Sequence, residues 1–372
     1  MRVTVERAAL VKALGHVHRV VERRNTIPIL SNVLLRADGG GLKLKATDLD
    51  LEVIETIPAE ASQPGGTTAP AHTLHDIVRK LPDGAQVSLE TTGDSGQMQL
   101  RSGRSRFSLQ ALPEGDFPDI AAGEMSHRFS VEASTLRKLI GKTQFAISQE
   151  ETRYYLNGIF AHTIDVGGAT MLRMVATDGH RLARVEAPAP AGSTGMPGVI
   201  IPRKAVSEIQ KLIEGADQEV AIELSTTKIR VTVGQTVLTS KLIDGTFPDY
   251  QRVIPSGNDK QLVVDRGEFA AAVDRVSTIS SERGRAVKLS VADGKITLSV
   301  TNPDSGSATE ELEADYDGPA LDIGFNARYL LDITNELDGD TTLFRLAEPG
   351  SPTIIQDRDN APALYVLMPM RV

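Results

Sequence analysis

Asp178 and His180 lie two residues apart in the string Thr177-Asp178-Gly179-His180-Arg181, and they form the chain's most enzyme-like pair. A carboxylate beside an imidazole can support general acid–base catalysis, but such a site also needs a nucleophile or a metal partner. The serine in Gly192-Ser193-Thr194-Gly195 lacks the G-x-S-x-G spacing of a nucleophile elbow. We therefore expect no catalytic residue, and a hydrolase that uses Asp178 and His180 remains a rival hypothesis.

Metal and nucleotide sites are not predicted either. His16 and His18 are two apart on a predicted helix, so they point to different faces and cannot form the i, i+4 metal pair. We expect them at the surface or in a groove. Gly141-Lys142-Thr143 is similar to the end of a P-loop, but Leu136 stands where the first glycine is required. The chain has no cysteine, which excludes thiolate ligands and disulfides, so we expect no metal and no cofactor.

The charge of the chain is distributed unevenly. Its 372 residues carry 40 Lys and Arg against 49 Asp and Glu, which argues against a protein that coats nucleic acid through bulk positive charge. From Pro255 onward there are 11 basic and 20 acidic residues, so the deficit lies in the last third. The predicted helices of the first two thirds are basic, as expected for a positive lining that encloses a polyanion. Their basic residues are Arg7, Lys12, Arg19, Arg23, Arg24, Arg79, Lys80, Arg137, Lys138, Lys142, Arg203, Lys204 and Lys211.

No targeting segment is predicted. The chain has no run of about 18 apolar residues. Arg2, Glu6 and Arg7 interrupt the amino terminus where a signal peptide needs an apolar stretch. These observations predict a cytoplasmic protein.

Three segments of the chain share one pattern, in which a short strand ending on valine is followed by an acid and a helix. They begin at Val3-Thr4-Val5-Glu6, Phe129-Ser130-Val131-Glu132 and Leu262-Val263-Val264-Asp265. The acid is favourable at the positive end of the helix dipole. A second helix is predicted in each repeat, over residues 70–81, 202–213 and 326–337, and alternating strands lie between the helices.

Two short echoes fix the register of the repeats. Ala46-Thr47-Asp48 returns as Ala176-Thr177-Asp178, and Phe117-Pro118-Asp119 returns as Phe247-Pro248-Asp249, both displaced by about 130 residues. We predict an α+β fold of three repeated domains, 1–125, 126–254 and 255–372, each with two helices packed on antiparallel sheets.

Two further segments allow more than one interpretation. Arg153-Tyr154-Tyr155-Leu156 could be an ordinary strand with two half-buried tyrosines. Met368-Pro369-Met370-Arg371-Val372 ends the chain with exposed apolar residues, which is unusual for a terminus and indicates a pocket lining. Methionine suits a groove that accepts several apolar partners.

Several strings together resemble the bacterial DNA sliding clamps, the beta subunits of DNA polymerase III. They are RYYLNG at 153–158, ATDGHRLA at 176–183, IPRK at 201–204, SKLIDGTFPDY at 240–250, IGFN at 323–326 and the MPMRV terminus, with RSGRSRFSL at 101–109 and Ile27-Pro28-Ile29-Leu30 in the first third. The resemblance implies a head-to-tail homodimer whose six domains form a ring around double-stranded DNA. It implies a non-catalytic processivity factor that tethers DNA polymerases, with the clamp loader, ligase and mismatch-repair proteins as further partners through short linear motifs.

The resemblance also implies roles for individual residues. The partner-peptide pocket would consist of Leu156, Thr177, Gly179, His180, Arg181, Leu182, Pro248, Arg252, Val253, Asn326, Tyr329, Val366, Met368, Pro369, Met370 and Arg371. The residues near the duplex would be Arg24, Tyr154, Arg203 and Lys204, whereas His72 and Gln149-Glu150 depart from the family pattern and weaken the local positive field. The dimer interface would include Phe107, Thr278 and Ile279, with Thr278 more polar than is usual in the family.

A third hypothesis is a scaffold of repeated sheet domains that binds no nucleic acid. Oligomeric mass distinguishes it from the clamp, because a ring of this kind needs two chains.

Overall fold

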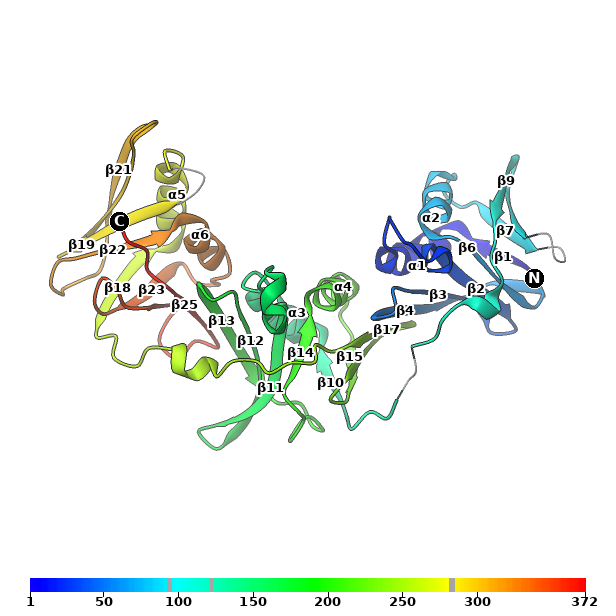
Figure 1. The fold of residues 1–372 in the computed structure, drawn as a ribbon, viewed down its shortest axis with the longest axis horizontal. Helices are drawn as coiled ribbons and strands as arrows, with labels where there is room; N and C mark the ends of the chain where they lie inside the picture. The colour runs from blue at the N-terminus through cyan, green and yellow to red at the C-terminus, as the bar shows by residue number, and fades with distance from the viewer. Residues whose placement is uncertain (92–95, 121–122, 281–284) are drawn as a thin grey trace. The chain divides into compact units, whose positions relative to one another are not determined.

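The computed structural model describes residues 1–91, 96–120, 123–280 and 285–372 (Figure 1). The chain forms two compact units. The first comprises residues 1–134, 190–193 and 207–242, and the second comprises 135–189, 194–206 and 243–372. We describe each unit by itself.

Two antiparallel sheets build the first unit. One has the order β5-β1-β7-β8-β9, with strands Glu60–Gln63, Arg2–Glu6, Gln86–Thr91, Gln97–Ser102 and Ser105–Gln110. The other has the order β10-β15-β16-β17-β4-β3-β2-β6, with strands His127–Glu132, Glu219–Leu224, Lys228–Val233, Thr236–Lys241, Leu51–Ile57, Gly41–Thr47, Asn32–Asp38 and Gly65–Pro70. Every strand pair in these two sheets is antiparallel.

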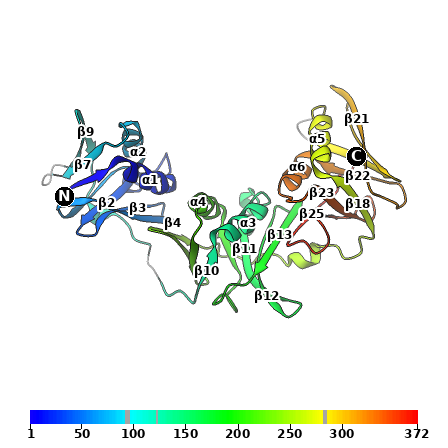
Figure 2. The same cartoon turned by 180° about the vertical axis from the view of Figure 1, so that it is seen from behind.

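Two more antiparallel sheets build the second unit (Figure 2). One has the order β14-β11-β12-β13-β25-β24-β23-β18, with strands Val199–Pro202, Gly158–Val166, Ala169–Thr177, Arg181–Pro188, Ala363–Leu367, Thr353–Gln356, Thr341–Leu346 and Lys260–Asp265. The other has the order β21-β20-β19-β22, with strands Gly306–Glu313, Lys295–Asn302, Ala286–Ala292 and Leu321–Asn326.

Each eight-stranded sheet is continuous across the junction between two sequence repeats. In the first unit β17 of the middle repeat pairs with β4 of the first, placing Leu238 opposite Val53. In the second unit β13 pairs with β25 of the last repeat, placing Leu182 opposite Val366. Main-chain hydrogen bonds therefore join consecutive repeats, and the junctions are not flexible tethers.

The helices lie where the sequence predicts them. They are α1 Arg7–Val17, α2 Ala71–Lys80, α3 Ala133–Gln144, α4 Arg203–Ile213, α5 Arg266–Ser277 and α6 Ala327–Asn335. The predicted acids cap two of them: the Glu6 carboxylate accepts from the amides of Ala8 and Ala9, and Asp265 accepts from the amide of Glu268. The α+β fold with antiparallel sheets is confirmed. The domain limits of 1–125, 126–254 and 255–372 stay a prediction.

Aliphatic side chains fill the cores. In the first unit Leu10, Leu14 and Val17 of α1 are fully buried, and the helix packs on β3 and β4. In the second unit Phe269 of α5 meets Phe344 of β23 with ring centroids 5.2 Å apart.

Two expectations about local structure are wrong. Residues 153–156 do not form a strand, because they lie in the 3-10 helix η4, Glu151–Leu156. The alternation of apolar and basic residues over 42–45 predicts a half-exposed strand; the strand forms, but Lys45 of β3 is only 4% exposed. Its ammonium pairs with Glu52 at 2.9 Å and with Asp119, and lies over the ring of Phe117.

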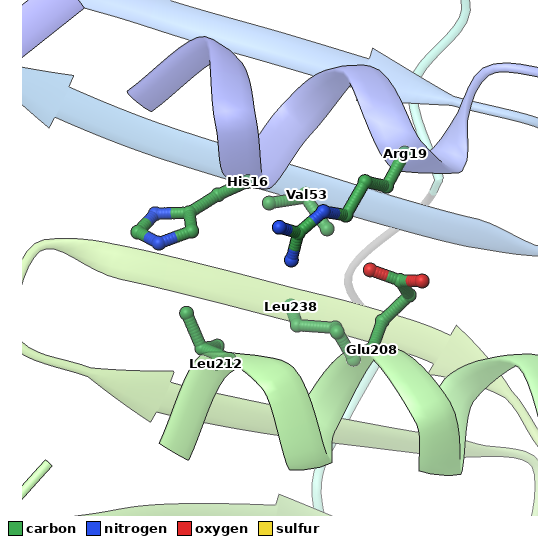
Figure 3. Close-up of a pocket in the computed structure, with 6 residues that line it drawn as sticks. All are labelled: His16, Arg19, Val53, Glu208, Leu212 and Leu238. Carbon is green, nitrogen blue, oxygen red and sulfur yellow. The ribbon is translucent and has the colours of Figure 1, made fainter. Parts of the chain in front are cut away.

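The histidines of α1 are more enclosed than the sequence suggests. His16 is half-buried and its Nδ1 lies 2.6 Å from Glu55 Oε2 of β4. Figure 3 shows this side of α1 facing α4 across a small cavity, where Arg19 points toward Glu208.

His18 belongs to a separate cluster with His72 and His75 of α2. It begins the 3-10 helix η1, His18–Val20, and its ring stacks on His75 with centroids 4.0 Å apart and planes 9° apart. Its Nδ1–H donates to the carbonyl of Leu14, and Nε2–H of His72 donates to the carbonyl of Val21. The cluster therefore packs α1 against α2 through imidazole rings.

Within residues 1–91, 96–120, 123–280 and 285–372, no helix is long and apolar enough to cross a membrane. In the same residues, no group of His, Asp and Glu side chains is arranged to hold a metal ion.

Candidate functional site

The turn between β12 and β13 holds the ATDGHR string in one fixed shape. Thr177 Oγ1 donates to the carbonyl of Arg181 at 2.7 Å and accepts from the amide of Gly179 at 3.1 Å. Asp178 Oδ1 accepts from the amides of His180 and Arg181. The Asp178 carboxylate is therefore a turn-forming group, whose hydrogen bonds lead to backbone amides and to the Arg181 side chain.

The echo in the first repeat forms the same turn. Thr47 Oγ1 donates to the carbonyl of Leu51 and accepts from the amide of Leu49. Leu49 has φ +79° and Gly179 has φ +88°, so both repeats place a left-handed residue at this point. The Arg153 guanidinium lies beside this turn, because a Cβ built at Gly179 would be 2.6 Å from it.

Arg181 anchors the turn to two helices. Its Nη1 donates to Asp332 Oδ2 of α6 at 2.5 Å, and its Nη2 donates to the carbonyl of Phe145 at 2.7 Å, just after α3. The guanidinium also lies over the rings of Phe145 and Tyr329, 5.0 and 4.3 Å from their centroids. With 8% exposure, Arg181 holds the site together from beneath and does not project from it.

The carboxyl-terminal segment joins this turn to β22. The amide of Met368 donates to the carbonyl of His180 at 2.9 Å, and the amide of Met370 donates to the carbonyl of Gly324 at 2.8 Å. Gly324 is required there, because a Cβ would lie 2.7 Å from the backbone oxygen of Met370. Residues 368–372 thus lie beside His180 on one side and β22 on the other.

The predicted apolar residues differ in how deeply they are buried. Leu156, Leu182 and Val366 are buried in one cluster, where they form a floor. Val253 and Met368 are 44% and 38% exposed, so they form an apolar rim. The cluster under the rim contains Leu156, Val175, Leu182, Ile200, Phe247, Tyr250, Ile354, Leu364 and Val366.

The polar residues of the predicted site surround this floor. His180 is exposed and its ring faces Tyr329 of α6 at a centroid distance of 6.2 Å. Burial raises the pKa of the Tyr329 hydroxyl. Asn326 caps α6 by accepting from the amides of Arg328 and Tyr329. Pro248 is exposed, and Arg252 pairs with Asp249 at 2.9 Å. Pro369 and Met370 are half-buried, and Arg371 is exposed.

Sequence reasoning missed residues that shape this site from below. Phe247 and Tyr250 belong to the FPDY string but were not predicted as site residues, and they are part of its floor. Phe247 stacks on Phe160 with centroids 4.9 Å apart. The repeat carries the missing signal, since Phe117 is equally buried, at 8%, in the first unit. Arg153, which contacts the turn at Gly179, was also missed.

The four predicted DNA-facing residues fall in both units. Arg24 is exposed on the loop that follows η1 in the first unit. In the second unit Tyr154 is 53% exposed, Arg203 is exposed, and Lys204 is half-buried. Tyr154 and Arg203 lie on adjacent elements, because the amide of Arg203 donates to the carbonyl of Asn157 at the end of η4. Glu150 is bonded to Arg153 there.

The predicted dimer-interface residues lie at or near sheet edges. Phe107 is on β9, the edge strand of the five-stranded sheet, and is half-buried. Thr278 and Ile279 follow α5, which packs on the edge strand β21. The carbonyl of Ile279 accepts from the Asn302 side chain at 3.0 Å, while Thr278 is exposed.

Comparisons with known proteins show which family shares this sequence and fold. Three family models cover the chain: the N-terminal domain of the DNA polymerase III beta subunit matches residues 1–121, the central domain matches 130–249, and the C-terminal domain matches 251–371. The beta sliding clamp of Caulobacter vibrioides is 56% identical over 372 residues, covering all of both chains.

Solved structures agree. A sliding clamp of Bartonella birtlesii bound to griselimycin is 57% identical with a TM-score of 0.97, and one of Pseudomonas aeruginosa bound to griselimycin is 41% identical with a TM-score of 0.94. Both comparisons cover all of both chains. The chain therefore belongs to the DNA polymerase III beta subunits, the bacterial sliding clamps that act in DNA replication as non-catalytic processivity factors, so the hydrolase hypothesis is wrong.

Proposed function

We propose that this chain captures short apolar segments of its replication partners in the groove between the His180 turn, the tail 368–372 and α6. The observation that carries the proposal is that two exposed apolar side chains, Val253 and Met368, closely follow Tyr250 and Val366 of the buried apolar cluster. A groove of this kind gains affinity by covering the rim, and its polar groups orient the ligand. The segments would come from DNA polymerases and, more specifically, from the clamp loader, ligase and mismatch-repair proteins.

The site residues proposed from the sequence divide by role. Val253, Met368, Met370, His180 and Tyr329 are the groups that would touch a bound segment. Arg181 would act through its hold on the turn, since its guanidinium is already bonded to Asp332 and Phe145.

Deleting residues 368–372 tests the groove. The tail contributes Met368 and Met370 to it, so the truncated chain should lose polymerase binding while its dimer stays intact. Unchanged polymerase binding would mean that the groove is misplaced.

For the DNA interaction we propose enclosure by a ring of two chains. Arg24, Arg203 and Lys204 would attract phosphates without reading bases, which leaves no preferred sequence to stop sliding. The protein loaded on closed circular DNA should remain bound through a high-salt wash and leave after the circle is cut. Equal loss from intact and cut circles would refute enclosure.

We propose that the ring closes where β9 of one chain meets β21 of another. The β9 hairpin carries Arg101, Arg104 and Arg106, whereas β21 carries Glu310, Glu311 and Glu313, so the two edges have opposite charges. Opposite charges favour this pairing over contact between like edges. A solution mass of one chain at every salt concentration would refute this ring closure. The proposal also includes domain limits of 1–125, 126–254 and 255–372 and a cytoplasmic location.

A further inference from the structure

The segment 243–254, which leads from the middle repeat to the last, lies on one face of the large sheet of the second unit. Phe247 and Tyr250 pack there among residues of β11, β12, β13, β24 and β25. The same segment carries the proposed groove residues Pro248, Arg252 and Val253. Its position on the sheet therefore sets the position of part of the groove.

The sheet face beneath this segment has an apolar part and a charged part. Register places His162 opposite Arg173 and Arg173 opposite Glu186 in three neighbouring strands. Arg173 Nε and Nη2 donate to Glu186 Oε2 at 2.8 and 2.6 Å. Tyr250 has its ring in the apolar cluster and its hydroxyl in the charged part.

The bonding partners fix the direction of each hydrogen bond. Arg173 Nη1 lies 3.0 Å from the Tyr250 oxygen, and arginine can only donate. His162 Nδ1 lies 3.1 Å from the carbonyl of Thr163, so Nδ1 carries a hydrogen. His162 Nε2 lies 3.0 Å from the Tyr250 oxygen and, in a neutral ring, accepts the phenolic hydrogen. The chain of bonds runs from Arg173 through the Tyr250 hydroxyl to His162.

The surroundings favour a neutral His162. Burial lowers the pKa of His162 and the nearby Arg173 cation lowers it further, although the bond to Thr163 raises it. A second cation, Arg184 on β13, is also near Tyr250, and burial lowers its pKa. Glu186 is the one carboxylate that these described contacts place beside them. A protonated His162 would add a third positive charge and would turn Nε2 into a donor.

We infer that His162 and Arg173 are positioning residues for partner binding: they hold the Tyr250 hydroxyl, and through it the segment that carries Pro248, Arg252 and Val253 to the groove. The inference rests on the proposed function, because it concerns the same groove. Neither side chain needs to touch the partner.

The test compares Tyr250→Phe with Tyr316→Phe in the full-length dimer. Both substitutions remove a buried tyrosine hydroxyl that donates a hydrogen bond, but Tyr316 bonds to the carbonyl of Pro319, away from the segment 243–254. The probe is griselimycin, measured by calorimetry, with the chain lacking 368–372 as a groove control. We expect Tyr250→Phe to weaken binding about fivefold, because Arg173 Nη1 and His162 Nε2 lose a partner, and Tyr316→Phe to leave it unchanged.

Hydrogen exchange gives a readout that does not depend on the probe. Tyr250→Phe should speed amide exchange in residues 243–254, and Tyr316→Phe should not. If Tyr250→Phe changes neither exchange nor binding while the tail deletion abolishes binding, the positioning role is refuted and the groove stands. If the tail deletion leaves binding intact, the groove itself is refuted.

A pH series separates positioning from a merely structural role. Binding by the parent chain should hold above pH 6.5 and weaken only as the pH falls below it, because the pKa of His162 lies below its usual 6.5. His162→Gln keeps an oxygen that can accept the Tyr250 hydrogen but cannot be protonated. This variant should therefore bind as tightly as the parent chain at neutral pH and show a shallower pH dependence. His180 is unchanged in both chains, so its contacts are common to the two profiles. Identical pH profiles would overturn the inference.

Discussion

Mild acid should loosen the packing of α1 against α2, because two stacked histidines that join these helices, His18 and His75, have lowered pKa values. The pKa of His18 is lowered from 6.5 to about 4, mainly by burial and also by His75, His72 and Arg19, against the raising effect of the Leu14 carbonyl. Burial also lowers the pKa of His75. Asp76 and Arg79 of α2 are the remaining charged groups near the stack.

The sign and size follow from linkage. Between pH 6.5 and about 4, His18 binds a proton in the unfolded segment but not in the folded one. The packing of α1 against α2 therefore has its full stability above pH 6.5 and loses stability as the pH falls through this window. At about pH 5 the full shift would cost about 2 kcal/mol, and because His18 is partly exposed to solvent we expect about 1 kcal/mol. That corresponds to roughly a fivefold rise in the open population.

Hydrogen exchange of peptides from α1 and α2, corrected for the intrinsic effect of pH, measures this population. Protection should fall in the parent chain from about pH 7 to pH 5, and His18→Gln should flatten the slope because glutamine does not titrate there. His127→Gln is the control, since His127 lies outside the cluster and bonds only to Ser126 among the contacts described. Equal slopes in the parent and His18→Gln would refute the reasoning.

Three further perturbations have expected outcomes. Gly179→Ala should lower the Tm by a few degrees and weaken polymerase binding, because Gly179 has φ +88°, a left-handed conformation that strains a residue with a Cβ. Leu49→Ala, at the matching turn, adds no such strain and should leave polymerase binding unchanged; equal effects would contradict this. Lys45→Met should destabilise the first unit by about 3 kcal/mol in urea unfolding, because it leaves the buried Glu52 carboxylate without its cation. Adding Glu52→Leu should recover much of the lost stability, and no recovery would argue against the ion pair. Phe107→Asp should shift the dimer toward monomer in a solution mass measurement, because it places a carboxylate in the proposed contact with the acidic β21, and an unchanged dimer would place the interface elsewhere.

The repeats and helices could be predicted because they depend on local patterns. The helix predicted over 70–81 is α2, Ala71–Lys80, and the one predicted over 202–213 is α4, Arg203–Ile213. The Ala-Thr-Asp echo is also a local structure, since Thr47 and Thr177 close the same hydrogen-bonded turn. Spacing along the chain carries this information directly.

Residues defined by distant contacts could not be predicted in this way. The bonds of Arg181 reach 36 residues back to Phe145 and 151 residues forward to Asp332, so nothing near Arg181 in the sequence distinguishes an anchor from a surface arginine. Residues 153–156 have strand-forming composition, yet η4 forms because the surrounding fold places them there. His18 needed the position of α2 before its stacking on His75 could be seen.

The continuity of the large sheets has a consequence for fragments of this protein. A piece ending near residue 125 would lose β17 and leave the amides and carbonyls of β4 bare, and a piece beginning near residue 255 would do the same to β25. Unpaired strand edges of this kind can pair with strands of other chains, so isolated repeats should aggregate more as their concentration rises.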